Sequence, residues 1–156
     1  MGKLGFVLYS VLLALWTGGI VTFTFLVTPA IFKHFGRDIA SAVLDRLFAV
    51  YFPYNLVVAA AILLCLLGVG HLLTTAGRTS SLALAVVAVL TCSFVQFKLY
   101  PDIKQTKAAI SSFEQTDPSS PERAAFRRLH GISAGLNLLL LADGLCLVII
   151  AAVARK

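Results

Sequence analysis

The polar residue whose position most needs a chemical explanation is Asp143, which lies inside an otherwise uncharged run from Leu129 to Ala154. If this run crosses a membrane as a helix, Asp143 lies about 13 Å from one membrane surface. An aspartate at that depth costs about 2.5 to 3.5 kcal/mol. Two interpretations stay open. Asp143 is a protonated group that hydrogen-bonds a neighbouring helix or a second subunit, or it belongs to an ion or proton pathway.

Hydroxyl and amide side chains occur in the same apolar runs, and their depths predict two levels of polar groups. A buried hydrogen-bond network that joins three helices would satisfy them. Small and hydroxyl residues also pack helices closely without any ligand, so close packing and a polar conduit are both consistent with the pattern. The candidates for the network are Thr17, Thr24, Thr91, Gln96, Asn137 and Asp143.

Histidines are the other candidates for chemistry. His34 and His130 are expected at one membrane face and His71 near the other, and residues about 30 Å apart cannot share one metal ion. A pair formed by His34 and His130 could hold a haem or a metal, although interfacial histidines usually serve as hydrogen-bonding groups. The metal ligands, if any, stay unknown. The candidates at this face are His34, Asp102, Arg128, His130 and Ser133.

The elements that must position these residues follow from the composition. Of the 156 residues, 59% are hydrophobic and only 13% are charged, which is typical of a membrane protein. This composition excludes a disulfide scaffold and a large catalytic domain outside the membrane, and it gives no support for nucleic-acid binding. Four runs long enough to cross a membrane as helices lack charged residues, apart from Asp143: residues 4–32, 47–77, 79–97 and 129–154.

The sequence therefore predicts one all-α domain, residues 1–156, that is a four-helix transmembrane bundle. Residues 38–51 have apolar and polar faces and predict a short interfacial helix between the first two spans. Tyr51, Phe52 and Tyr54 are expected in the aromatic belt, and Gly77 is expected to cap the second span. The third and fourth helices are expected to extend as a hairpin, with a kink at Pro101. The expected spans are about 4–32, 53–76, 82–100 and 129–153.

Basic residues predict the orientation. Four of the 13 Lys and Arg residues fall on the side of the termini, and nine fall on the side of the hairpin. The positive-inside rule then places the hairpin in the cytoplasm and both termini on the non-cytoplasmic side. We expect a bacterial inner membrane or a membrane of the secretory pathway. The nine residues are Lys33, Arg37, Arg46, Lys98, Lys104, Lys107, Arg123, Arg127 and Arg128.

Most of the chain resembles the transmembrane protein 205-like family of small four-span membrane proteins. The family's activity is not settled, so the resemblance implies a fold more than a function. At the position of Asp143 the family looks able to carry asparagine, which favours hydrogen bonding over an obligatory charge. The resemblance rests on Phe126–Leu147, with His130-Gly131-Ile132-Ser133, Asn137 and Asp143-Gly144-Leu145-Cys146-Leu147, on Leu47-Phe48 with Tyr51-Phe52, and on Tyr100-Pro101-Asp102.

A second likeness concerns the first span alone. Trp16-x-Gly18-Gly19 and Pro29-x-x-Phe32 look like the opening helix of copper-resistance D-type membrane domains and of the small membrane oxidase of haem synthesis. Those proteins typically carry a histidine early in that helix. Residues 7–13 contain none, which argues against haem or copper ligation here.

These observations predict a non-enzymatic membrane protein that self-associates and acts in membrane assembly or in the passage of a small solute or ion. No cofactor is expected. The alternative is a haem- or metal-binding membrane protein that uses His34 or His130. The expected partners are the lipid bilayer and a second copy of the chain, and the basic hairpin could contact anionic lipid headgroups.

Overall fold

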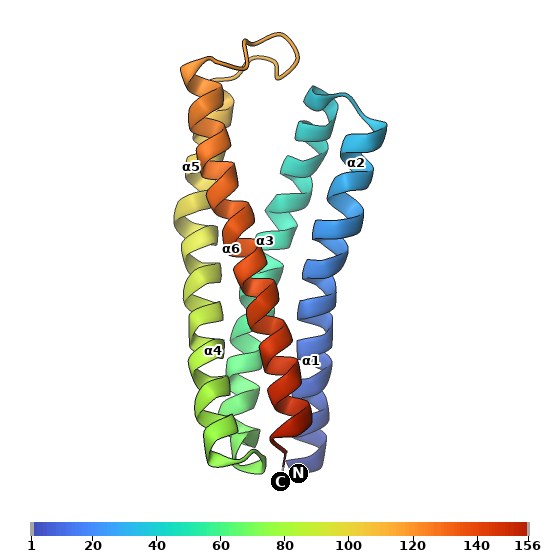
Figure 1. Ribbon diagram of the computed structural model, residues 1–156, viewed down its shortest axis with the longest axis vertical. Helices are drawn as coiled ribbons and strands as arrows, with labels where there is room; N and C mark the ends of the chain where they lie inside the picture. Colours follow the sequence, from blue (N-terminus) through green and yellow to red (C-terminus); the bar gives the residue numbers. More distant parts are fainter. Residues whose placement is uncertain (1, 156) are drawn as a thin grey trace.

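The computed structural model describes residues 2–155 and is helical almost throughout (Figure 1). It confirms the predicted all-α fold, with four helical segments long and apolar enough to cross a membrane: Lys3–His34, Arg37–Leu72, Thr75–Ala108 and Pro121–Val153. The elements are α1 Gly2–Thr22, the π-helix η1 Phe23–Val27, α2 Thr28–His34, α3 Arg37–Val69, the 3-10 helix η2 Gly70–Leu72, α4 Thr75–Phe94, the π-helix η3 Val95–Leu99, α5 Tyr100–Ala108 and α6 Pro121–Val153.

The first and third spans each contain a π-helical turn that directly precedes a proline-bearing helix. Pro29 follows η1, and Pro101 follows η3. A proline has no backbone N–H and crowds the preceding turn, so the regular helical ladder is interrupted there. The widened turns keep the backbone paired, because Thr28 N–H donates to the carbonyl of Phe23, and Tyr100 N–H donates to that of Val95. Such turns often occur at functional sites.

The predicted interfacial helix is not a separate element. Residues 38–51 form the first part of α3, which continues without a break through Pro53 to Val69. The prediction began the second span at about Pro53, because proline suits the first turn of a helix. Within a membrane bundle, neighbouring helices hold such a helix in place, and the proline is tolerated.

The turn between the second and third spans also differs from the prediction. Gly77 does not cap a helix: α3 ends at Val69, and α4 begins at Thr75 after a short 3-10 turn. Thr74 caps α4, since its hydroxyl accepts a hydrogen bond from the N–H of Gly77. The absence of a side chain at Gly77 instead permits close packing, because an added Cβ would lie 2.5 Å from the Cβ of Ala154.

The predicted hairpin of the third and fourth helices does not project alone. α5 ends at Ala108, and the loop 109–120 leads to α6, whose first turn is capped by the hydroxyl of Ser120. α2 and the first half of α3 rise beside this hairpin (Figure 1). We call the end of the bundle that holds both termini the terminal end. The end that holds the turn 35–36 and the loop 109–120 is the loop end.

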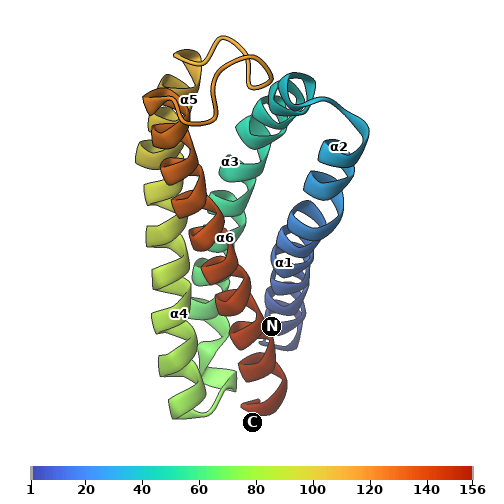
Figure 2. The same cartoon turned by 45° about the horizontal axis from the view of Figure 1, so that its top comes forward.

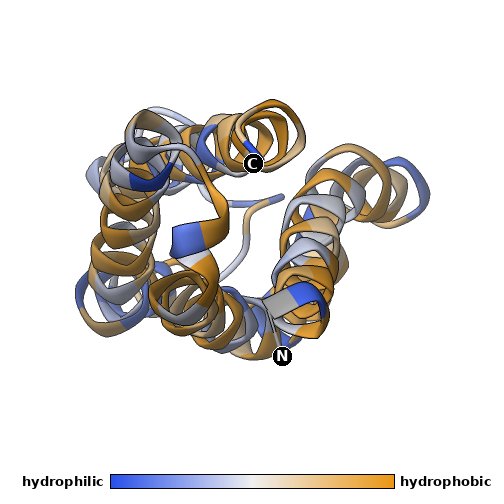
Figure 3. Ribbon diagram, turned by 90° about the horizontal axis from the view of Figure 1, so that it is seen from below, coloured by the Kyte–Doolittle hydropathy of each residue, from blue (hydrophilic) through white to orange (hydrophobic). Residues whose placement is uncertain are grey.

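At the terminal end the spans pack around a common core, and an open hollow of about 560 Å³ lies between α1 and α6. Figure 3 shows the helices from below, arranged around a common centre, with hydrophobic residues along much of their length. Here α1 and α4 each pack against both α3 and α6. Large apolar side chains such as Val57 and Leu64 remain about two-thirds exposed, as expected for a surface that faces lipid. The fully buried side chains here include Tyr9, Leu13, Trp16, Ile20, Ile62, Leu66 and Leu147.

At the loop end the bundle opens. α2 packs against α3, and α5 packs against α6, but α2 and α6 diverge (Figure 1). Among residues 2–155, no packing comparable to these pairs joins α2 to α6. A separate aromatic and aliphatic cluster fills the base of the opening, with Tyr51, Phe52, Val95 and Leu99 as its buried members. The opening places a cavity above this cluster.

Candidate functional site

The loop end contains two adjoining hollows, which together we call the loop-end cavity. One has a volume of about 220 Å³ and lies between α3, α5, α6 and the loop 109–120. The other, of about 290 Å³, lies between η1, α2, α3 and α6. They adjoin, because Phe48, Phe52, His130 and Ser133 line both.

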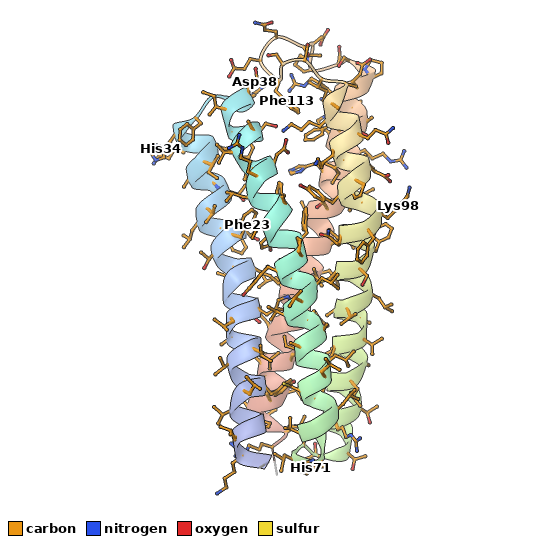
Figure 4. The ribbon with its side chains drawn as sticks, turned by 180° about the vertical axis from the view of Figure 1, so that it is seen from behind. Phe23, His34, Asp38, His71, Lys98 and Phe113 are labelled. Carbon is orange, nitrogen blue, oxygen red and sulfur yellow. The ribbon has the colours of Figure 1, made fainter. Side chains whose placement is uncertain are left out.

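Aromatic side chains make up much of the wall of the loop-end cavity. Phe48 and Phe52 stack with their ring centroids 5.0 Å apart, and the edge of Tyr100 meets Phe52 at 5.1 Å. Phe23, which points into the bundle in Figure 4, stacks on Tyr51 at 4.1 Å. The second hollow reaches the outer surface beside Phe25 and Leu138, which are 55% and 50% exposed. An apolar molecule in the bilayer therefore has a lateral entrance.

The charged residues that line the cavity, Arg37 and Asp45, belong to the first hollow. Asp45 forms an ion pair with Lys107, and the Lys107 ammonium also donates to the carbonyl of Ser41 at 3.0 Å. Arg37 lines the same hollow and makes no ion pair within residues 2–155. Across the hollow, the imidazole of His130 stacks on Phe126. The arrangement can bind an acidic head group at Arg37 and an apolar chain among the aromatic rings.

Three polar side chains from three spans are linked at the base of the second hollow. The hydroxyl of Tyr51 donates to Asn137 Oδ1 at 2.6 Å, and Asn137 Nδ2 donates to the hydroxyl of Thr24 at 2.7 Å. The side chain of Asn55 is also tied here, by a 2.9 Å bond to the carbonyl of Tyr51. These bonds hold η1, α3 and α6 in register below the opening.

The loop 109–120 contributes Phe113 to the lining of the first hollow, and it lies beside the start of α3 (Figure 2). Asp38 accepts hydrogen bonds from Ser112 Oγ at 2.6 Å and from the N–H of Phe113 at 2.5 Å. Figure 4 shows Asp38 beside Phe113. Arg123 of α6 donates to the carbonyls of Phe113 and Thr116. Within the loop, the N–H of Ser119 donates to Asp117, which lowers the pKa of that carboxyl.

We expect Asp38→Ala to release the loop from α3. Two charge-assisted bonds are lost, so amide exchange over residues 112–116 should become about tenfold faster or more. Hydrogen–deuterium exchange with mass spectrometry checks this. Asp102→Ala is the matched control, because Asp102 makes only an exposed ion pair with Lys98. Equal exchange of the loop in the two variants would contradict the anchoring role.

The predicted network residues fall into separate groups. Thr24 and Asn137 are hydrogen-bonded to one another at the base of the cavity. Thr17 and Asp143 are buried in the terminal half, and their oxygens have no hydrogen-bond partner within residues 2–155; the same is true of Gln96 Oε1. Thr91 is half-buried on α4. One continuous network of direct hydrogen bonds is therefore not present among the described side chains.

The residues predicted for the cytoplasmic face do not converge either. His34 points away from the bundle at the end of α2 (Figure 4), whereas His130 and Ser133 line the loop-end cavity. Asp102 pairs with Lys98 on the outer side of the third span, and Arg128 is exposed. His71 lies at the opposite end, as predicted (Figure 4). Within residues 2–155, no three His, Cys, Asp or Glu side chains are grouped so that they could hold a metal ion.

Sequence reasoning missed the aromatic wall of the cavity. Tyr51 and Phe52 were expected in the aromatic belt, but both are 8% exposed and face the interior. The signal that could have found them is the spacing of the aromatic residues. Tyr51 and Phe52 follow Phe48 by three and four residues, which places them beside it on one side of a helix. Arg37 was used only as one of the basic residues that predict the orientation of the chain in the membrane.

Comparison with known proteins identifies the family. A sequence model described as "Domain of unknown function (DUF4149)" matches residues 11–112. The chain belongs to the DUF4149 family. An uncharacterized protein of Aquifex aeolicus (strain VF5) is 29% identical over 130 residues, which are 82% of this chain and 83% of that protein. No solved structure matches significantly.

The DUF4149 match covers most of α1 and continues through α5, so it includes Arg37, Phe48 and Phe52. It ends before α6, which supplies His130 and Asp143. The chain is thus a multi-pass membrane protein of a family whose function is unknown. The resemblances to the transmembrane protein 205-like family and to copper-resistance domains stay predictions.

Proposed function

We propose that this DUF4149 protein binds a single-chain amphipathic molecule with an acidic head group and acts by binding or transfer rather than by catalysis. The observation that carries the proposal is the loop-end cavity, which combines aromatic walls, a lateral opening beside Phe25 and the unpaired cation Arg37 at its mouth, within the described residues. The amphipathic molecule would be the small solute whose passage was predicted from the sequence.

The chemistry of the lining supports this class of ligand. Aromatic rings from four spans offer an apolar site, and ligand sites of this kind use a few polar groups to fix the orientation of the bound molecule. Lys107 pairs with Asp45, which leaves the guanidinium of Arg37 without an ion pair in the described part of the chain. A carboxylate or a phosphate would be attracted to it. Hollows of about 220 and 290 Å³ offer room for a single acyl chain rather than for a lipid with two.

The sequence arguments supply the setting for this proposal. The resemblance of α6 to the last span of the transmembrane protein 205-like family supports a relationship to that family. The excess of basic residues at the loop end supports a cytoplasmic location for that end, with both termini on the other side of the membrane. We propose a bacterial inner membrane or a secretory-pathway membrane as the location. Self-association and contacts between Arg128 and anionic headgroups remain part of the proposal.

The test is photocrosslinking in liposomes with a palmitate analogue that carries a diazirine on its chain. We expect labelling of cavity residues such as Phe48 and His130, competed by unlabelled palmitate and much less by the matching fatty alcohol. Arg37→Gln should weaken binding about tenfold, because a charge-assisted bond contributes about 1.5 to 3 kcal/mol. Arg46→Gln is the matched control, since Arg46 lies on the same helix but does not line the cavity.

Two results would overturn the proposal. One is labelling confined to lipid-facing residues such as Val57 and Leu64, without competition by palmitate. The other is equal binding by Arg37→Gln and Arg46→Gln.

A further inference from the structure

The open hollow between α1 and α6 in the terminal half, which we call the α1–α6 hollow, shares no lining residue with the loop-end cavity. The two helices lie side by side here (Figure 1). Small residues of α1 line the hollow: Ser10, Ala14 and Gly18 recur every four residues and therefore share one face of the helix. A hollow on a surface that faces lipid is filled either by a lipid chain or by another helix.

The dimensions of the α1–α6 hollow suit a lipid chain. Its volume is about 560 Å³, and its lining extends along α1 from Phe6 to Gly18. This part of the helix is about 18 Å long. One leaflet contributes about 15 Å to the hydrocarbon layer of a bilayer. An extended acyl chain that starts at the membrane surface would therefore lie in the hollow over most of its length.

A cation lies at the end of the hollow that is nearest to the membrane surface. Arg155 lines the hollow and follows the last apolar span, which ends at Val153. Its guanidinium lies over the ring of Phe6, 4.7 Å from the ring centroid. The backbone beside it is tied to the turn before α4, because the N–H of Thr74 donates to the carbonyl of Ala154. The charge of Arg155 is thus held at the level of the lipid head groups.

The guanidinium of Arg155 keeps donors for a ligand. It forms no ion pair within residues 2–155. Contact with the ring of Phe6 does not consume its N–H groups, because an aromatic ring attracts the charge and not a single donor. A phosphate group can accept two of these N–H groups in parallel. The hollow therefore combines an apolar groove with a site for a phosphate at its outer end.

The distribution of acidic residues argues against a second copy of the chain as the occupant. Asp143 is buried, and the other six of the seven acidic residues belong to the loop end. A copy in the same orientation would cover Arg155 without offering a carboxylate side chain, and a cation that loses its water without gaining a partner is costly. The six residues are Asp38, Asp45, Asp102, Glu114, Asp117 and Glu122.

We propose that the α1–α6 hollow binds one acyl chain of an acidic phospholipid from the leaflet at the terminal end, with the lipid phosphate at Arg155. A lipid with a choline or ethanolamine head group binds less tightly, because its own positive charge competes with Arg155 for the phosphate. The bound lipid would join the first and last spans. The proposal does not depend on which ligand the loop-end cavity binds.

The test is fluorescence quenching in vesicles of phosphatidylcholine that contain a small share of brominated lipid, either phosphatidylglycerol or phosphatidylcholine. The reporter is Trp16, the protein's single tryptophan, which lies beside the hollow because its chain neighbour Thr17 lines it. Bromine atoms on a lipid chain quench tryptophan only at short range. We expect brominated phosphatidylglycerol to bind about fivefold more tightly than brominated phosphatidylcholine, as one basic residue near the membrane surface provides.

The role of Arg155 is tested by charge. Arg155→Gln should abolish the preference for phosphatidylglycerol, whereas Arg155→Lys keeps the charge and should keep the preference. Arg78→Gln is the matched control, because Arg78 is a basic residue of the same end that does not line the hollow. A preference that is equal in Arg155→Gln and Arg78→Gln would overturn the proposal.

The groove itself is tested by filling it. Ala14→Leu should weaken quenching by phosphatidylglycerol, and Ala142→Leu should not, because Ala142 is an exposed alanine of α6 outside the hollow. Equal quenching by the two brominated lipids in the wild type, as expected if a second copy of the chain covers the hollow, would contradict the proposal. So would equal effects of the two leucine variants. None of these measurements involves palmitate or the residues of the loop-end cavity.

Discussion

Replacement of Gly144 by leucine is expected to destabilise the protein by about 1 to 3 kcal/mol, the usual cost of forcing extra atoms into a packed interior. An added Cβ at Gly144 would lie 2.7 Å from Thr17 Oγ1 and 3.4 Å from the ring of Trp16. Both neighbours belong to α1 and are buried, so α1 and α6 would have to move apart. Thermal unfolding of the purified protein in a mild detergent measures the change.

Gly135→Leu is the matched control for this substitution. Gly135 lies on the same helix, but no atom outside that helix's own backbone lies within 4 Å of a Cβ added there. Leucine is also the better helix former, so this variant should be as stable as the wild type or more stable. Equal losses of stability at the two glycines would show that α1 and α6 do not approach closely at Gly144.

A double variant locates the strain at one contact. In Gly144→Ala the new methyl group meets the hydroxyl of Thr17, and Thr17→Ala removes that hydroxyl. The two changes together should therefore cost less than the sum of their separate effects. Strict additivity would contradict the geometry.

The spans could be predicted because they depend only on the local absence of charge. Each of the four segments found in the structure contains one of the predicted spans over most of its length. The beginning of α6 was also a local property, since Ser120 and Pro121 are a cap followed by a favourable first residue. The start of the second span at about Pro53 was predicted by the same kind of reasoning, and it is wrong because α3 begins at Arg37.

The cavity could not be predicted, because it depends on contacts between distant residues. Asp38 and Ser112 are bonded although 74 positions separate them, and Tyr51 and Asn137 are 86 positions apart. Counting residues along a span predicts the depth of a side chain, and it placed Thr24 and Asn137 at one level. It does not predict the direction in which a side chain points, and this is why the inward orientation of Tyr51 was missed.

The terminal half is stabilised by the packing of its interior side chains. Trp16→Ala removes the largest of them and is therefore expected to lower the free energy of unfolding markedly. In water-soluble proteins the loss of a buried tryptophan costs about 3 to 5 kcal/mol. In a bilayer the surrounding lipid is itself apolar, so the part of this cost that comes from transfer out of water is small and the lost contacts dominate. We therefore expect about 2 to 3 kcal/mol for Trp16, whose side chain is fully buried.

The neighbouring Leu15→Ala should cost little, because Leu15 is 56% exposed and lipid can replace its contacts. Trp16→Phe should lie between the two, because it keeps a six-membered aromatic ring and removes only the pyrrole part of the indole, whose N–H has no hydrogen-bond partner within residues 2–155. Unfolding by sodium dodecyl sulfate, followed by far-ultraviolet circular dichroism, measures all three variants without the fluorescence of the protein's single tryptophan. Equal midpoints for Trp16→Ala and Leu15→Ala would mean that the terminal half does not depend on its interior packing.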